Sequence, residues 1–300
     1  MNRADIEHQI ETDIASKLNR CGMMFRMFGR AKTKHSLAHK MEIKGDKYRS
    51  GASKIQDIIG VRIIVYFTDD VEVVKTLFEN RNANVVDMSI DRPDSNTFCP
   101  QRLNLVCSVP DYLVDNFRKA LVDNYGDNAD YIDNTFEVQI RTIFSEGWHE
   151  VEHDLRYKCK EDWVGYDKQS RTLNGVIATL ENAEFSMLSL FKDMALSNYN
   201  QGNYSAMLRN HLRIRLTGNG LSPEIIEYLQ NNPEVAKAVY EADRGVVMTS
   251  LLYHKHKLKL HYDNVLFLMN HITMELLDEG LMALESEAFK EDFEKFKHAL

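Results

Sequence analysis

The chain has 300 residues, of which 44% are hydrophobic and 27% are charged. This composition supports a sizeable core and excludes a chain that is disordered along most of its length. The formal net charge of −8 argues against a general nucleic-acid coat, although it leaves local basic patches open. No apolar run approaches the roughly 18 residues of a membrane-spanning helix, and the first residues lack an apolar signal core. We therefore expect a cytoplasmic protein with no membrane partner.

The first half of the chain alternates between helical and strand patterns. Apolar residues at helical spacing predict a helix over residues 3–20, and a polar, basic helix is expected over 35–49. Residues 58–67 are β-branched and almost continuously apolar, which is typical of a strand buried on both faces. The remaining predicted elements are a helix over 70–80, strands over 85–90, 103–109 and 136–142, and a helix over 143–158.

From about residue 168 the pattern is helical, and no stretch reads convincingly as a strand. Residues 222–224 (Ser-Pro-Glu) and 232–234 (Asn-Pro-Glu) combine a capping side chain, proline at the first helical position and an acid, so both predict helix starts. Residues 217–220 predict a turn, and the apolar stretches are expected to be core. We divide the chain into an α+β domain at 1–160 and an all-helical region at 161–300, which could serve regulation, oligomerisation or substrate binding.

Residues 149–153, HEVEH, fit the H-E-x-x-H pattern of zinc peptidases. A zinc site needs a third ligand, for which Glu181 and Glu184 are the candidates on the next helix. The zinc peptidase is therefore a remote hypothesis. The four cysteines form no C-x-x-C pair, so we expect reduced thiols.

Residues 26–54 contain nine lysines and arginines against two acids, an excess of nine minus two, or +7. Such an excess suits a polyphosphate or nucleic-acid site, but on charge alone a solvated basic face is equally compatible. Within the segment, Arg30, Lys32, Ser36 and Lys40 form R-x-K-x-x-x-S-x-x-x-K. If the helix starts near Ser36, this serine caps it and Lys40 follows one turn later on the same side. Four donors would then converge on one volume, as phosphate oxygens require.

Two carboxylates follow, Asp57 and Glu137, each in or just before a predicted strand that also carries an arginine, Arg62 or Arg141. Two acids beside a basic pocket suggest Mg²⁺ that bridges to phosphates. The alternative is that they are ordinary strand-end acids paired to those arginines.

Four motifs occur in order: R-x-K-x-x-x-S-x-x-x-K from Arg30, D-I-x-G-x-R over 57–62, E-V-Q-I-R-T over 137–142, and W-x-x-x-E-H-x-L-x-Y-K over 148–158. With them, residues 1–160 resemble the synthetase domain of the RelA/SpoT family, and small alarmone synthetases in particular. The resemblance implies a mixed, roughly five-stranded nucleotidyltransferase-like sheet flanked by helices. It also implies transfer of the β,γ-pyrophosphate of ATP to the ribose 3′-hydroxyl of GDP or GTP, which makes (p)ppGpp and releases AMP.

The resemblance also implies site residues. Carried over by position, Asp57 and Glu137 hold Mg²⁺, Gln139 and Arg141 line the catalytic site, and Arg62 supports it. The ATP phosphates are assigned to Arg30, Lys32, Ser36 and Lys40. The family helix pattern accounts for Trp148, Glu152 and His153, and it leaves only His149 and Glu150 of the zinc pattern without an explanation.

The acceptor segment of the family, G-Y-x-S-x-H, reads CPQRLN at residues 99–104 here. Pro100 replaces the tyrosine that stacks on guanine, while Arg102 and Asn104 replace the serine and histidine and become the predicted acceptor-binding residues. Phe98 is a candidate replacement ring. The acceptor stays open between a guanine nucleotide and a tRNA 3′ end, as in toxin members, and a third alternative is a nucleotide-binding module without transfer.

A basic, histidine-rich stretch at 253–262 could touch RNA, although a solvated helix face explains it as well. A homo-oligomer is also compatible with the helical region.

Overall fold

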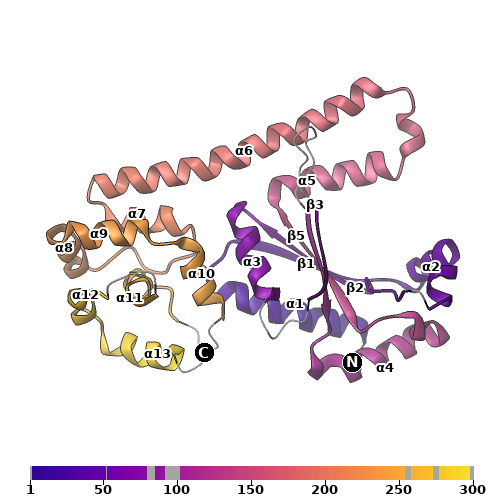
Figure 1. Ribbon diagram of the computed structural model, residues 1–300, viewed down its shortest axis with the longest axis horizontal. Coiled ribbons are helices and arrows are strands. Elements are labelled where there is room, and N and C mark those ends of the chain that lie inside the picture. The colour runs from indigo at the N-terminus through magenta and orange to yellow at the C-terminus, as the bar shows by residue number, and fades with distance from the viewer. Residues whose placement is uncertain are drawn as a thin grey trace. The chain divides into compact units, whose positions relative to one another are not determined.

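A computed structural model of the chain describes residues 2–51, 53–79, 85–91, 102–253, 258–272 and 277–297. The chain divides into two compact units (Figure 1). The first contains Met1–Ala15 and Phe25–Glu184, and the second contains Ser16–Met24 and Phe185–Leu300. The long helix α6 (Asp167–Asn200) contributes to both units. In the described part of the chain, no helix has the length and apolarity that crossing a bilayer would need.

The first unit is built on a mixed five-stranded sheet with the strand order β1-β2-β5-β4-β3. β2 and β5 are parallel, and the other neighbouring strands are antiparallel. The strands are β1 (Phe25–Ala31), β2 (Ile59–Val65), β3 (Val85–Asp91), β4 (Arg102–Ser108) and β5 (Thr135–Thr142). The predicted fold class is confirmed: a mixed sheet with flanking helices, followed by a helical C-terminal region.

Five α-helices of this unit accompany the sheet: α1 (Arg3–Arg20), α2 (Lys34–Arg49), α3 (Asp69–Glu79), α4 (Asp111–Tyr125) and α5 (Ile143–Glu152). The helix predicted over 143–158 is α-helical only to Glu152 and continues as a π-helix over His153–Tyr157. β1 and α4 are absent from the sequence prediction.

The sheet has one apolar face and one polar face, because successive side chains of a strand point to opposite sides. On the apolar face, Val61 and Ile63 of β2 and Val138 and Ile140 of β5 are buried. The prediction that residues 58–67 are buried on both faces is therefore wrong for the first half of β2, where every second residue is only partly buried on the polar face.

Helix α1 covers the apolar face at the edge strand β1. An added Cβ on Gly29 would lie 1.8 Å from Oε1 of Glu7, so the Glu7 side chain occupies the space below this glycine. Gly29 pairs with Val61, which places α1 on the apolar side. The opposite face of β1 is left for polar side chains.

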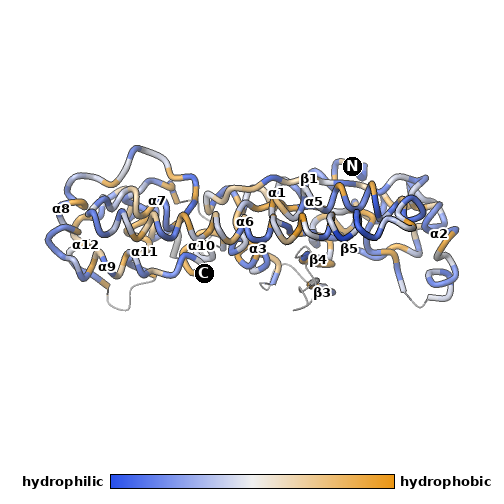
Figure 2. Tube along the Cα trace, turned by 90° about the horizontal axis from the view of Figure 1, so that it is seen from above, coloured by the Kyte–Doolittle hydropathy of each residue, from blue (hydrophilic) through white to orange (hydrophobic). Residues whose placement is uncertain are grey.

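The second unit consists of helices in the part that the structure describes. They are the end of α6, α7 (Tyr204–Leu212), α8 (Pro223–Asn231), α9 (Pro233–Glu241), α10 (Arg244–Tyr253), α11 (Tyr262–Ile272), α12 (Glu279–Ala283) and α13 (Glu287–Lys297). Hydrophobic and hydrophilic residues alternate along these helices, as expected of amphipathic helices (Figure 2). α8 and α9 begin at the predicted prolines, although neither Ser222 nor Asn232 makes the capping side-chain hydrogen bond. Residues 254–257 of the basic stretch lie outside the described residues.

Candidate functional site

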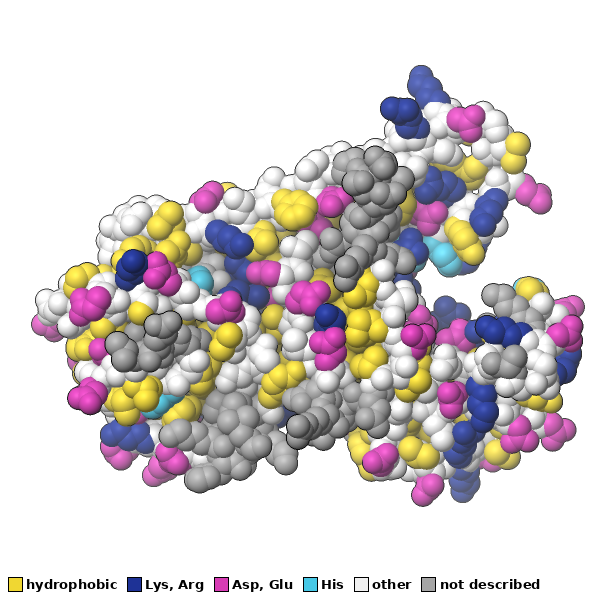
Figure 3. All heavy atoms as spheres, viewed as in Figure 1, with side chains coloured by type: hydrophobic (Ala, Val, Ile, Leu, Met, Phe, Trp, Pro, Cys, Tyr) yellow, Lys and Arg dark blue, Asp and Glu magenta, His cyan; other side chains and the backbone are white. Residues whose placement is uncertain are grey.

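A cavity of about 600 Å³ opens on the polar face of the sheet. Figure 3 shows the surface of this unit hollowed between α2 and the turn that leads from α5 to α6. The cavity is lined by Arg26, Phe28, Gly29, Arg30, Lys32, Asp57, Gly60, Val61, Arg62, Ile64, Glu137, Gln139, Ile143, Glu146 and Glu150. Six of the predicted site residues are among them, whereas Ser36, Lys40, Arg102, Asn104 and Arg141 lie outside this lining.

Strand register brings a cation and a carboxylate together on the cavity floor. Gly60 of β2 lies opposite Arg30 of β1 and beside Glu137 of β5. A Cβ added to Gly60 would meet no heavy atom within 4 Å. The missing side chain therefore leaves open space between Arg30 and Glu137, where a ligand group can lie.

Asp57 lies just before β2 and holds two lysines. Its Oδ2 accepts from Lys32 Nζ at 2.6 Å, and its Oδ1 accepts from Lys40 Nζ at 2.8 Å. Burial would raise the pKa of the Asp57 carboxyl, but the hydrogen bonds from both lysines outweigh it and hold the pKa below its usual value. The backbone N–H of Lys32 donates to the carbonyl of Ile58 at 2.7 Å, which fixes the end of β1 against the start of β2.

Ser36 does not cap α2, so that prediction is wrong. The helix begins at Lys34, and the cap is Thr33, whose Oγ1 accepts from the backbone N–H of Ser36 at 3.1 Å. The Thr33 hydroxyl also donates to Ser36 Oγ at 2.9 Å. Ser36 thus lies in the first turn, one turn before Lys40 and on the same side of the helix.

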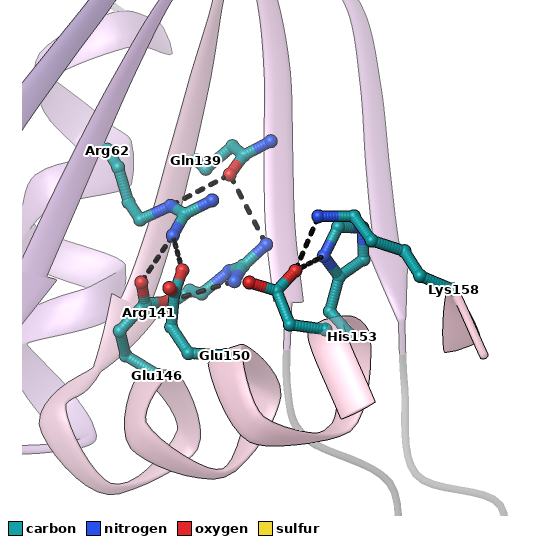
Figure 4. A network of polar contacts seen from close by, with 8 residues as sticks. Arg62, Gln139, Arg141, Glu146, Glu150, His153 and Lys158 are labelled. Atoms are coloured by element: carbon teal, nitrogen blue, oxygen red, sulfur yellow. Dashed lines mark hydrogen bonds and ion pairs between the residues drawn. The ribbon is translucent and has the colours of Figure 1, made fainter. Parts of the chain in front are cut away.

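Two arginines from neighbouring strands share the same partners (Figure 4). Arg62 donates to Gln139 Oε1 at 3.1 Å, to Glu146 Oε1 at 2.5 Å and to Glu150. Arg141 donates to Glu146 Oε2 at 2.9 Å and to Gln139 Oε1 at 3.3 Å. The alternative in which Asp57 and Glu137 pair with these arginines is therefore wrong, because the arginine partners come from α5.

The two guanidinium groups respond differently to this network. Burial would lower the pKa of Arg62, but the carboxylates of Glu146 and Glu150 outweigh it, and the pKa is raised. The pKa of Arg141 is lowered by burial, assisted by Arg62 and Arg102 and opposed by Glu146. Arg141 is therefore held in a more electropositive environment than Arg62.

His149 of α5 lies in the same electropositive region. Burial, followed by Arg141 and Arg102, lowers the pKa of its imidazole to about 3, so the ring is neutral at pH 7. Its Nδ1 is buried and has no hydrogen-bond partner. A neighbourhood that disfavours the imidazolium also disfavours a divalent cation on this histidine.

The rest of the H-E-x-x-H pattern is engaged in other contacts. Glu150 accepts from Arg62, and His153 Nδ1 lies 3.0 Å from Asp154 Oδ1, which also accepts from Lys158 Nζ at 2.5 Å (Figure 4). Of the proposed third ligands, Glu184 accepts from the Thr142 hydroxyl. No group of three or more His, Cys, Asp or Glu within the described ranges is arranged to hold a metal ion. The helix instead supplies carboxylates to the site arginines.

Arg102 and Asn104 lie on β4, with Asn104 beside Gln139 of β5. Asn104 Oδ1 is buried and has no hydrogen-bond partner. Phe98, Cys99 and Pro100, on which the altered acceptor motif depends, lie outside the described residues. The structure thus places Asn104, one of the two predicted acceptor residues, beside Gln139 of β5, which lines the cavity.

The cavity residues that the sequence prediction missed include Phe28, Gly60 and Glu146. Gly60 lies inside the D-I-x-G-x-R motif, and Glu146 follows Arg141 by five residues. Phe28 alternates with Arg26 and Arg30, and this spacing is the signal that could have identified it as part of a strand.

Residues 29–162 match a family model described as a region found in RelA/SpoT proteins. This segment is therefore similar to the RelA/SpoT family. It includes the whole cavity lining except Arg26 and Phe28.

Two curated relatives from Bacillus subtilis (strain 168) are similar to this chain. The GTP pyrophosphokinase YwaC is 30% identical over 138 residues, which cover 44% of this chain and 58% of the relative. The GTP pyrophosphokinase YjbM is 31% identical over 105 residues, which cover 35% of this chain and 43% of the relative. The similarity thus spans about half the length of these relatives.

Solved structures of small alarmone synthetases from Bacillus subtilis also match. Synthetase 2 has a TM-score of 0.46 and 24% identity over 63% of this chain and 92% of that chain. Synthetase 1, bound to its product pppGpp, has a TM-score of 0.46 and 20% identity over 62% of this chain and 91% of that chain.

Proposed function

We propose that the chain is an ATP-dependent pyrophosphokinase that transfers the β,γ-pyrophosphate of ATP to the ribose 3′-hydroxyl of GDP or GTP. The observation that carries the proposal is the meeting of cations and two carboxylates on the polar face of the sheet. Lys32 and Lys40 contact Asp57, and Arg30 lies across Gly60 from Glu137. The names of the two curated relatives support the same reaction class.

In this reaction the 3′-oxygen of the acceptor bonds to the β-phosphorus of ATP. The bond from that phosphorus to the α,β-bridging oxygen breaks, and AMP leaves with the bridging oxygen. Such transfers depend mainly on positioning and on neutralising phosphate charge. Arg30, Lys32 and Lys40 supply positive charge, and the lysines can exchange their Asp57 hydrogen bonds for phosphate oxygens.

Asp57 and Glu137 fit a divalent cation. Both line the cavity, and two carboxylates with phosphate oxygens are the ligands that Mg²⁺ favours. The open space at Gly60, next to Glu137, leaves room for them. We therefore propose Asp57 and Glu137 as the residues that hold Mg²⁺, which when bound would neutralise charge on the transferred group.

We assign the acceptor to the β4 side of the site, where Arg102 and Asn104 lie next to the catalytic strand. Arg102 brings a guanidinium fork suited to phosphate or to a base edge. A guanine nucleotide is the proposed acceptor, and the 3′ end of tRNA would present the same ribose hydroxyl to the same residues.

The experiment is AMP release from γ-labelled ATP with Mg²⁺, with GDP, GTP and deacylated tRNA offered in separate reactions. Label on a guanine nucleotide, matched by AMP, is the expected result. Label on tRNA would replace the proposed acceptor, and ATP binding without transfer in any reaction would favour a nucleotide-binding module.

Matched carboxylate variants test the site assignment in the same assay. Asp57→Ala and Glu137→Ala should abolish AMP release while the chain stays folded. Asp115→Ala, which removes an exposed carboxylate on α4, should leave AMP release unchanged. Full activity in either cavity variant would refute the assignment.

A further inference from the structure

Two side chains outside the cavity hold the backbone carbonyl of Lys32. The hydroxyl of Tyr125, the last residue of α4, donates to this carbonyl at 2.6 Å. Arg3, the first residue of α1, donates through Nη1 to the same carbonyl and to the Tyr125 hydroxyl. The Arg3 guanidinium also lies over the Tyr125 ring, 5.0 Å from its centroid. We call Arg3 and Tyr125 the carbonyl clamp.

The carbonyl clamp completes the anchoring of the chain at the end of β1. The backbone N–H of Lys32 donates to the carbonyl of Ile58 at 2.7 Å, and Ile58 follows Asp57 directly in the chain. Both backbone polar groups of Lys32 are therefore bound by elements that are distant from it in sequence. As a consequence, the point from which the Lys32 side chain extends is fixed relative to Asp57.

A fixed backbone is important at Lys32 because of the task of its side chain. The ammonium donates to Asp57 Oδ2 at 2.6 Å, and the side chain is 14% exposed. A lysine side chain is long and has a large rotamer entropy, so its ammonium is well placed only when the backbone is held. Exchange of Asp57 for a phosphate oxygen requires the ammonium to lie within hydrogen-bond distance of both partners, which a shift of about 1 Å would prevent.

The clamp residues are separated from the ligand space itself. Neither Arg3 nor Tyr125 is among the residues that line the cavity, and Tyr125 is only 8% exposed. Burial, opposed by Arg3, raises the pKa of the Tyr125 hydroxyl, which therefore stays protonated and donates at neutral pH. Arg3 also lies outside residues 29–162, which match the family model. An effect of the clamp on a ligand is therefore expected to pass through Lys32.

We propose that Arg3 and Tyr125 are positioning residues that hold the Lys32 ammonium where it binds a phosphate of the donor nucleotide. The proposal rests on the proposed function for the assignment of Lys32 to phosphate. It requires that the carbonyl clamp contributes to ligand affinity only while residue 32 carries an ammonium group.

The test is a double-mutant cycle on the binding of inorganic tripolyphosphate with Mg²⁺, measured by calorimetry. Tyr125→Phe removes the hydroxyl and keeps the ring, and it should weaken binding by about 2- to 10-fold, as expected for one lost hydrogen bond. Arg3→Lys keeps the charge but loses the planar fork that reaches both oxygens, and it should weaken binding to a similar extent. In a Lys32→Met background, either substitution should change the affinity by less than about twofold. Arg30 and Lys40 remain in that background, so binding should stay measurable.

Tyr112→Phe is the matched control. Tyr112 also belongs to α4, and its hydroxyl also donates to a side chain of α1, that of Asp13, without contacting Lys32. This variant should leave tripolyphosphate binding unchanged. Hydrogen exchange of the Lys32 amide, followed without a ligand, should be faster in Tyr125→Phe than in the wild type and unchanged in Tyr112→Phe.

Two results would overturn the proposal. One is equal weakening by Tyr125→Phe with and without the Lys32 ammonium, which would make the clamp a general structural contact. The other is unchanged affinity in both Tyr125→Phe and Arg3→Lys, with urea unfolding showing that the fold is retained. Failure of the proposed function has a different signature: the wild type makes no AMP with any acceptor, while Tyr125→Phe still weakens tripolyphosphate binding only when Lys32 is present.

Discussion

Replacing Glu146 by alanine is expected to destabilise the first unit strongly. The Glu146 side chain is only 10% exposed, and its two oxygens accept from Arg62 at 2.5 Å and from Arg141 at 2.9 Å. The Arg141 side chain is 4% exposed. Removing one partner of a buried ion pair leaves an uncompensated charge and costs about 3–5 kcal/mol. With an m-value of about 2 kcal/mol/M, the urea midpoint should fall by about 1.5–2.5 M.

Glu150 provides the matched control for this variant. It contacts the same guanidinium nitrogen of Arg62, but its side chain is 57% exposed. Exposed ion pairs contribute about 0–1 kcal/mol, so Glu150→Ala should shift the midpoint by about 0.5 M at most. Both variants remove one carboxylate from Arg62, but only Glu146→Ala also removes the carboxylate that pairs with the buried Arg141. The comparison therefore measures the cost of leaving Arg141 without that partner.

Tryptophan fluorescence during urea unfolding is the assay. The chain has two tryptophans, Trp148 and Trp163, and both belong to the first unit, so the signal does not report on the helical unit. Equal destabilisation by Glu146→Ala and Glu150→Ala would refute the reasoning. So would a loss below about 1 kcal/mol in Glu146→Ala, because the arginines would then be stabilised by solvent or by Gln139 alone.

Three further variants test other parts of the site. Gly60→Val places a side chain between Arg30 and Glu137 and should weaken ATP binding by roughly tenfold or more. The urea midpoint should change little, since no heavy atom lies within 4 Å of the added Cβ. Unchanged affinity would show that no ligand group lies there. The lowered pKa of Asp57 means that its ion pairs stabilise the fold above the unfolded pKa and are lost as the pH falls through the folded pKa. The difference in unfolding free energy between the wild type and Asp57→Asn should therefore be constant near neutral pH and shrink below about pH 4, and a flat difference would contradict the pairing. The imidazole of His149, with a pKa of about 3, should show no titration by NMR between about pH 8 and pH 5. In the unfolded chain the imidazole takes up a proton below its ordinary pKa of 6.5, whereas in the folded chain it stays neutral down to about pH 3. The contribution of His149 to the free energy of unfolding should therefore be lost as the pH falls from 6.5 toward 3, and His149→Phe should lack this contribution.

The elements that could be predicted from sequence are those with a clear apolar pattern, either continuous or alternating. β2 has a nearly continuous apolar run and β5 has apolar residues at alternate positions, and their boundaries lie within two residues of the prediction. β1 was harder to recognise because Arg26 and Arg30 occupy its exposed face, so its pattern resembles a basic loop. The cap of α2 shows another limit: Thr33 and Ser36 are both good caps by type, and only the backbone geometry distinguishes them.

The partners within the site could not be predicted, because they depend on strand register and on helix position. The sequence left open the alternative that Asp57 pairs with Arg62, because both lie at or in the same predicted strand. In the structure Asp57 accepts from Lys32 and Lys40, which approach from the end of β1 and from α2. Arg62 instead meets Glu146, which is distant in sequence but reaches it because α5 packs on β2 and β5.

These pairings partly neutralise the lysine and arginine side chains that lie on the polar face of the sheet. Lys32 and Lys40 are neutralised in part by Asp57, and the arginines of β2 and β5 by the carboxylates of α5. The two groups differ in burial: the Asp57 pairs are partly exposed and can exchange with phosphate, whereas the pair between Arg141 and Glu146 is buried and expensive to break. We therefore expect the α5 side of the site to keep its pairs when a ligand binds, and we propose that a polyphosphate replaces Asp57 as the partner of Lys32 and Lys40.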